Sequence, residues 1–245
     1  MNFRKYWILL FWILLSGFNF PNEKKFLSQK AENISVFDSK GNVFDLFSLL
    51  GNKPLVISPV YTKCPSVCGI ISNGVQTVVN KLGTLGKDFN IVSFSFDSSD
   101  KKEDLAFYES RWKMDGLHWK TISAKADQIK KLMQSFDYQF EYDSTTKEFN
   151  HPSILIVLTP SGKISRYIYG INPSKRDLKL ALIEAMAEKS RPGLIKGFYL
   201  RCFGYDPVSK TYKLDWRFLI STSAGLLMIG LISWIFIKSF IVSKN

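Results

Sequence analysis

The sequence predicts an α/β domain, with helices covering both faces of a mixed sheet, between two apolar terminal segments. Short apolar runs typical of buried strands alternate along the chain with segments of helical periodicity. An apolar run follows a basic N-terminus, and an uncharged apolar run lies near the C-terminus. Of the 245 residues, 46% are hydrophobic, which is ample for the core of one domain.

The first half of the domain contains two predicted strands and two predicted helices. Residues 55–61 are an apolar run, and residues 67–82 carry apolar side chains at helical spacing. Residues 90–96 alternate between apolar and serine side chains, as a strand with two unlike faces does. We expect Asp100 to cap a helix over residues 102–112.

The second half repeats the alternation and ends in a hairpin and a helix. A brief strand is predicted over 119–122 and a helix over 126–136. Apolar strands over 154–158 and 164–169 flank a turn rich in polar residues, and a last helix covers 175–188. A parallel arrangement closed by a hairpin is the order of the thioredoxin-like fold, here with one inserted strand and helix.

Both ends of the chain have the pattern of membrane segments. Residues 1–20 join a basic start to a short apolar run, which predicts a signal peptide or an N-terminal anchor, with a buried core helix as the alternative. Residues 218–237 carry no charge and are long enough to span a bilayer. The domain over 26–190 would then be followed by a linker over 191–217, the span, and a short tail over 238–245.

Charge predicts the orientation and the class of partner. Arg4 and Lys5 favour a cytoplasmic N-terminus, which places the domain in the periplasm beside a bacterial inner (cytoplasmic) membrane. The net charge is +12, but the basic residues are scattered and match no nucleic-acid-binding motif. We therefore expect an anionic membrane surface beside the domain and no nucleic-acid partner.

Three cysteines are too few for a disulfide-rich scaffold, and two of them are four residues apart. Cys64 and Cys68 lie where a strand gives way to a helix, and a helix N-terminus lowers the pKa of a nearby thiol. Lys63 is expected to act in the same direction. If the first turn is helical, both sulfurs share one face. They could form a disulfide or bind a soft metal ion such as copper(I).

A metal site would need a further ligand, and the sequence offers two histidines. His151 lies in the loop before strand 154–158, which runs beside the cysteine turn in the thioredoxin order, whereas His118 has no such placement. A structural disulfide, a dithiol redox centre and a metal site all remain open, as does a purely structural role for His151. Cys202 is assigned no role.

Three motifs resemble the Sco/SenC family over roughly residues 40–190. Residues 61–68, Tyr-Thr-Lys-Cys-Pro-Ser-Val-Cys, resemble its Thr-x-Cys-Pro-x-x-Cys centre. Residues 97–100 resemble its Asp-x-x-x-Asp segment with one residue fewer. Residues 150–163, Asn-His followed by an apolar strand and Thr-Pro-Ser-Gly-Lys, resemble its Asp-His and Asp-Pro-x-Gly stretch.

The resemblance implies a copper-binding, thioredoxin-like protein that helps to assemble the copper centre of cytochrome c oxidase. Cys64, Cys68 and His151 match the copper ligands of the family, and Asp97 matches an acidic residue with a supporting role. The chain departs from the family at Gly69, where proline is usual, at the residue before the histidine, and in its C-terminal span. None of these departures removes a ligand, so they bear on the choice of partner.

Two main hypotheses follow. The first is a membrane-anchored metallochaperone that delivers copper to an oxidase subunit carrying a copper centre. The second is an enzyme, a thiol–disulfide reductase in which Cys64 attacks a disulfide of a respiratory copper site and Cys68 resolves the mixed disulfide. A sensor that signals through the C-terminal span is a weaker third hypothesis, because the tail after the span is too short for a signalling domain.

Overall fold

The computed structural model describes residues 20–64, 67–188, 202–206 and 208–242. The chain divides into two compact units, residues 1–189 and 190–245, which are described separately. The predicted signal peptide or N-terminal anchor lies outside the described residues, apart from Phe20 at its end.

The first unit is built on a mixed sheet with the strand order β2-β1-β5-β4-β3-β8-β9 among the described residues. Only the central strands are parallel: β3 pairs with β4 and β4 with β5, while the other neighbours are antiparallel. The strands are β1 (Ser35–Asp38), β2 (Val43–Asp45), β3 (Leu55–Val60), β4 (Asn90–Ser95), β5 (Trp119–Ser123), β8 (Ile154–Leu158) and β9 (Ile164–Tyr169).

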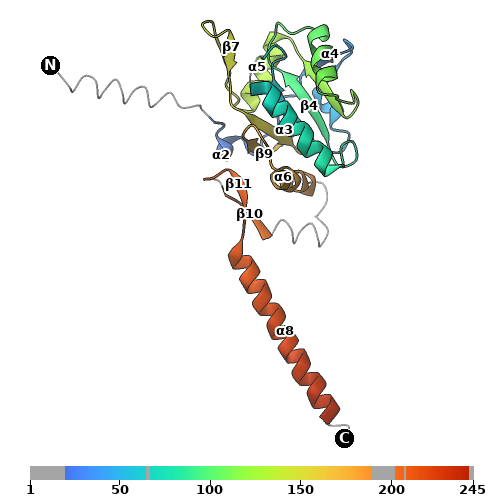
Figure 1. Ribbon diagram of the computed structural model, residues 1–245, viewed down its shortest axis with the longest axis vertical. Coiled ribbons are helices and arrows are strands. Elements are labelled where there is room, and N and C mark those ends of the chain that lie inside the picture. Colours follow the sequence, from blue (N-terminus) through green and yellow to red (C-terminus); the bar gives the residue numbers. More distant parts are fainter. Residues whose placement is uncertain (1–19, 65–66, 189–201, 207, 243–245) are drawn as a thin grey trace, which may run out of the picture. The chain divides into compact units, whose positions relative to one another are not determined.

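Helices cover both faces of this sheet (Figure 1). The helices are α2 (Glu23–Phe26), the 3-10 helix η1 (Leu46–Leu49), α3 (Val67–Leu82), α4 (Lys102–Arg111), α5 (Ala126–Ser135) and α6 (Lys175–Ala187). On β3, Leu55 and Ile57 face the cluster that contains α5, whereas Val56 faces the cluster that contains α3 and α6. Because β3 is buried on both faces, its sequence is a continuous apolar run.

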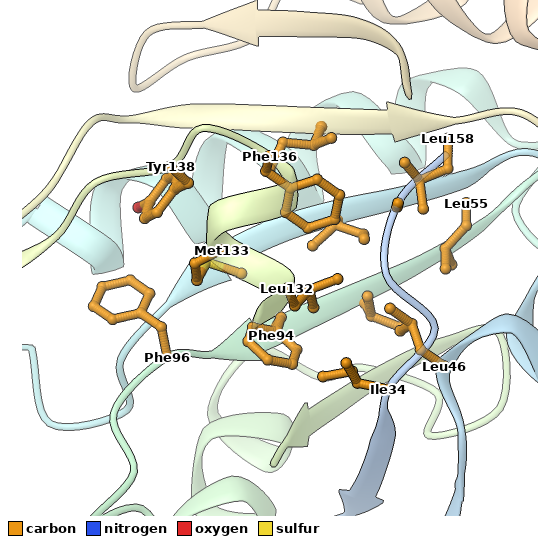
Figure 2. Packing of buried hydrophobic residues seen from close by; sticks show 14 of the residues in the cluster. Ile34, Leu46, Leu55, Phe94, Phe96, Leu132, Met133, Phe136, Tyr138 and Leu158 are labelled. Atoms are coloured by element: carbon orange, nitrogen blue, oxygen red, sulfur yellow. The ribbon is translucent and has the colours of Figure 1, made fainter. Parts of the chain in front are cut away.

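The core beneath α5 carries aromatic side chains toward one edge of the sheet. Figure 2 shows Leu132 between Phe94 and Phe136, with Phe96 and Tyr138 at one end of the cluster. The ring centroids of Phe96 and Tyr138 are 5.8 Å apart. Cys64, in the turn after β3, packs against the same cluster.

These elements confirm the predicted thioredoxin-like α/β architecture, with one correction at a helix terminus. The residue at the N-cap position of α4 is Lys101, whose backbone N–H donates to the Asp104 carboxylate at 2.9 Å. Asp100 does not cap the helix, because its carboxylate accepts hydrogen bonds from Thr62 and Ser95 instead. Tertiary contacts have overridden the local capping pattern at this position.

The second unit contains a hairpin and a long helix. Strands β10 (Phe203–Asp206) and β11 (Thr211–Leu214) pair antiparallel within the range predicted to be a linker. Helix α8 (Trp216–Val242) follows, and Asp215 accepts hydrogen bonds from the backbone N–H groups of its first turn. By length and composition α8 is the one helix in the described part of the chain that could cross a membrane, with a mean hydropathy of 1.4 over Trp216–Trp234.

Candidate metal centre

The strand order brings Cys64 and His151 to the same edge of the sheet, namely the one at which β3 and β4 end. Cys64 follows the C-terminal end of β3, and His151 precedes the N-terminal end of β8. Because β3 and β8 are antiparallel, with Leu55 opposite Leu158, these two ends are adjacent. The predicted neighbourhood of the cysteine turn and the His151 loop therefore follows from the register of the two strands.

His118 lies at the opposite edge of the sheet. It precedes β5, which runs parallel to β4 and so begins at the edge where β3 also begins. Its ring packs on Gly86, where a Cβ atom would lie 2.5 Å from the ring. Gly86 also has a φ of 76°, a backbone conformation that glycine adopts without strain. The two histidines thus have distinct environments, and only His151 lies near Cys64.

The cysteine turn connects β3 to α3. Cys64 is half-buried, and its backbone N–H donates to the Tyr61 carbonyl at 3.3 Å. Cys68 is the second residue of α3, and its side chain lies outside what the structure describes. Thiols at the start of a helix lie where the helix dipole favours negative charge.

The imidazole of His151 is enclosed by aromatic rings. Phe96 and Tyr61 contact it edge-to-face, with centroid separations of 5.1 and 5.8 Å. Its Nδ1 lies 2.9 Å from the Tyr138 hydroxyl and 3.3 Å from the Pro152 carbonyl oxygen. Burial lowers the pKa of His151, outweighing the hydrogen bond with Pro152 and the charge of Cys64, which raise it. The ring is therefore neutral near pH 7, as a metal ligand must be.

Asp100 is a residue of the site that the sequence reasoning assigned to another role. Its side chain is 0% exposed. It accepts hydrogen bonds from the Thr62 backbone N–H at 3.0 Å, the Thr62 hydroxyl at 2.7 Å and the Ser95 hydroxyl at 2.6 Å. Since Thr62 lies two residues before Cys64, these bonds tie the cysteine turn to the end of β4. The only sequence signal was the resemblance of residues 97–100 to a paired-aspartate motif.

Two other charged residues near the turn have mainly structural contacts. The Lys63 ammonium lies 3.4 Å from Asp104 and 3.6 Å from Asp100. Burial acts to lower the pKa of Lys63, but these carboxylates raise it overall, so the ammonium stays charged and pairs with Asp104 and Asp100. Asp97 follows β4 and accepts the Ser99 backbone N–H at 2.8 Å, which stabilises the turn that leads to Asp100.

A separate hairpin leads into the His151 loop and was not expected from the sequence. Strands β6 (Glu141–Asp143) and β7 (Glu148–Asn150) pair with each other and extend away from the main sheet (Figure 1). Phe149 anchors the hairpin to the core, with its ring centroid 5.1 Å from that of Tyr61 and 5.5 Å from that of Phe96. The same rings that contact His151 therefore also hold the strand before it.

The side chains at this edge fit a soft metal ion in donor chemistry. The described side chains do not include that of Cys68, and among them no three His, Cys, Asp or Glu residues are placed to hold a metal. Cys64 and His151 supply a sulfur and a neutral imidazole nitrogen, and Cys68 follows Cys64 by four residues. Thiolate and imidazole donors suit copper(I), whereas carboxylates would suit harder ions.

Comparisons with known proteins identify the fold and the family. The sequence matches the SCO1/SenC family over residues 23–187. The crystal structure of a proposed electron transfer protein from Aquifex aeolicus VF5 is 36% identical, with a TM-score of 0.63, over 67% of this chain and 96% of that chain. No curated protein matches the sequence.

Two more distant structures share the fold. ScoI from Bradyrhizobium japonicum, solved with copper bound, is 19% identical with a TM-score of 0.53, over 67% of this chain and 99% of that chain. BsSco, a Sco family cytochrome c oxidase assembly protein with a disulfide switch, is 19% identical with a TM-score of 0.58, over 70% of this chain and 98% of that chain. The family match, which spans the whole sheet and the candidate site, shows that the chain belongs to the SCO1/SenC family.

Proposed function

We propose that this chain is a membrane-anchored copper metallochaperone that binds copper through Cys64, Cys68 and His151. The observation that carries the proposal is the convergence of the Cys64 turn and the neutral imidazole of His151 at one edge of the sheet. The copper-bound structure of ScoI from Bradyrhizobium japonicum supports it, because that protein has the same fold.

The proposed ligand set suits transfer of the ion as well as binding. Two thiolates and one imidazole give a low coordination number, which leaves room for a ligand of the acceptor protein to approach. The cysteines must be reduced to bind copper(I), so the redox state of the pair controls loading. The acceptor would be a cytochrome c oxidase subunit that carries a copper centre, in keeping with the assembly role of BsSco.

The proposed location follows from the two apolar segments. The predicted span over 218–237 falls within α8, so α8 would anchor the chain. Because the basic N-terminus favours a cytoplasmic start, the domain between the two apolar segments would face the periplasm beside the bacterial inner membrane. An oxidase subunit with its copper centre on the same side of the membrane would be within reach of the domain.

A copper titration of the reduced full-length chain in detergent tests this function. Wild type, His151→Ala and the matched control His118→Ala are compared, with bound metal counted per chain and affinity measured against a copper(I) chelator. We expect one tight equivalent in wild type and in the control. His151→Ala should bind about 100-fold more weakly or worse, because loss of a second-shell partner alone costs about 10-fold to 100-fold. Equal affinity in all three proteins would contradict the site.

A thiol–disulfide reductase is the second candidate, and the position of Cys64 beside the start of α3 favours it. Exchange chemistry needs the two thiols and does not need His151. The titrated proteins should therefore also be assayed for reduction of a model disulfide. Rapid exchange in wild type and His151→Ala, with tight copper in neither, would replace the metallochaperone by the reductase.

A further inference from the structure

The hydroxyl of Tyr138 lies between His151 and the backbone that follows it. Tyr138 is buried at the end of the aromatic core, three residues after α5 (Figure 2). Its hydroxyl is 2.9 Å from His151 Nδ1 and donates to the Pro152 carbonyl oxygen at 3.1 Å. His151 Nδ1 is in turn 3.3 Å from the same carbonyl oxygen.

Counting the protons in this triangle indicates which ring nitrogen carries hydrogen. A tyrosine hydroxyl has one proton to donate, and a carbonyl oxygen can only accept. If the hydroxyl donates to Pro152, then Nδ1 must be the donor to the tyrosine oxygen. If the hydroxyl donated to Nδ1, the Nδ1 lone pair would face the lone pairs of the Pro152 oxygen at 3.3 Å without a proton between them. The Nδ1–H form satisfies both contacts.

The consequence for metal binding concerns the other ring nitrogen. In the neutral ring with hydrogen on Nδ1, Nε2 carries the lone pair. Phe96 and Tyr61 meet the ring edge-to-face and restrict its rotation. Metal-binding histidines commonly donate their second N–H to a fixed partner, which sets the tautomer and the orientation of the ring.

We propose that Tyr138 is a positioning residue that holds His151 in the Nδ1–H tautomer and so presents Nε2 to copper. This inference rests on the proposed function for its metal, although the tautomer itself is a property of the metal-free chain. The tyrosine acts through hydrogen bonds with His151 and Pro152 and does not bind the metal.

Nitrogen NMR of the reduced, metal-free full-length chain in detergent tests the tautomer directly. The chain has two histidines, so ¹⁵N-histidine labelling gives two rings, and a His118→Gln variant assigns them. Wild type should show protonated Nδ1 and unprotonated Nε2 at His151. In Tyr138→Phe, Nδ1–H loses its 2.9 Å partner and keeps only the longer 3.3 Å contact with Pro152, so the Nε2–H form should appear beside the Nδ1–H form. Copper(I) affinity should fall by about 10-fold to 100-fold.

Tyr167→Phe is the matched control. Tyr167 is also buried, and its hydroxyl donates to the Phe136 carbonyl oxygen at 2.9 Å, so this variant loses the same kind of bond. It should lower thermal stability to a similar extent while it leaves the His151 tautomer and copper affinity as in wild type.

Two results would overturn the inference. One is a wild-type His151 protonated on Nε2, and the other is a Tyr138→Phe variant with the wild-type tautomer and wild-type copper affinity. If wild type shows the Nδ1–H form but binds no tight copper, the tautomer assignment holds and the metallochaperone function fails, so the two failures are distinguishable.

Discussion

Single buried polar residues hold both sides of the candidate site. Asp100 binds Thr62 in the cysteine turn, and Tyr138 binds Pro152 next to His151. A buried polar group that loses its hydrogen-bond partner still carries the full free-energy cost of desolvation. Conformations that break one of these bonds are therefore disfavoured, and each bond holds the backbone around it in one conformation. The positions of the proposed ligands therefore depend on residues that are not ligands.

Asp100→Asn should loosen the cysteine turn. The amide keeps the size of the side chain, but its nitrogen cannot accept the hydrogen bonds that Thr62 and Ser95 donate. We expect the free energy of unfolding to fall by about 2 kcal/mol and copper(I) affinity to fall with it. Urea denaturation and chelator competition measure the two effects.

Asp38→Asn is the control for this variant. Asp38 is buried and accepts hydrogen bonds from Lys40 and Asn42 at the turn between β1 and β2. This variant should lose a comparable amount of stability and retain wild-type copper affinity. If Asp100→Asn binds copper as tightly as Asp38→Asn, the carboxylate does not position the turn.

The limits of prediction from sequence are clear at this scale. Residue type and spacing were enough to select Cys64 and His151 as candidates and to exclude His118 on topology. The bond between Asp100 and Thr62 joins residues 38 positions apart, and no local pattern encodes it. Beside the start of a helix, an aspartate has the pattern of a cap, and only tertiary structure reveals its other partner.

Some helices and strands could be predicted from the sequence, and others could not. The bounds of long apolar segments such as β3 and α3 were predicted to within a residue or two. Strand β3 is buried on both faces and is a continuous apolar run, whereas α3 is buried on one face and carries apolar residues at helical spacing. Strands β1 and β2 at one edge of the sheet are only four and three residues long and have little periodicity. The β6–β7 hairpin is polar at most positions and depends on Phe149 for its anchorage, so its pattern indicates a loop.

Helix α6 is joined at its end to the turn between β8 and β9. Glu188 accepts a hydrogen bond from the Ser161 hydroxyl at 2.7 Å, and it lies 2.9 Å from the Lys163 ammonium. Burial acts to raise the pKa of Glu188, but hydrogen bonds from Thr159, Ser161 and Lys163 lower it to about 2. The carboxylate thus stabilises the fold only while it is ionised.

The contribution of Glu188 to the free energy of unfolding should decrease as pH falls. The folded pKa of Glu188 is below its usual value of 4.5, so its contribution is complete above pH 4.5 and is lost as pH falls toward about 2. Glu188→Gln should lower the free energy of unfolding by about 2 kcal/mol near pH 7, and the difference from wild type should shrink at pH 4 and pH 3. Urea denaturation at each pH measures it.

Glu103→Gln is the control for the pH series, because Glu103 is 69% exposed and its ion pair with Lys102 is on the surface. Surface pairs contribute little, so this variant should match wild type within about 0.5 kcal/mol at every pH. A difference between Glu188→Gln and wild type that stayed constant from pH 7 to pH 3 would show that the carboxylate does not act through its charge.

At the scale of the whole molecule, the proposed function requires the domain to lie on the periplasmic side of the membrane that α8 would cross. The domain precedes the β10–β11 hairpin, and α8 follows it, so α8 is where the chain would cross the membrane after the domain. If the domain is periplasmic, the hairpin must also be periplasmic and the residues after α8 cytoplasmic. One labelled position on each side of α8 can distinguish this topology from its reverse.

Labelling with a membrane-impermeant maleimide in spheroplasts tests the topology. In a background with Cys64, Cys68 and Cys202 replaced by serine, Val208→Cys and Lys244→Cys are compared. Val208 is 91% exposed at the hairpin turn, and Lys244 follows α8 in the sequence. We expect Val208→Cys to label in intact spheroplasts and Lys244→Cys only after lysis, because a charged reagent does not cross the bilayer. Labelling of Lys244→Cys alone in intact spheroplasts would reverse the topology, and labelling of both would mean that α8 does not span. The reversed topology would remove the copper site from the compartment in which the proposed delivery takes place, whereas labelling of both would remove the C-terminal anchor from the proposed function.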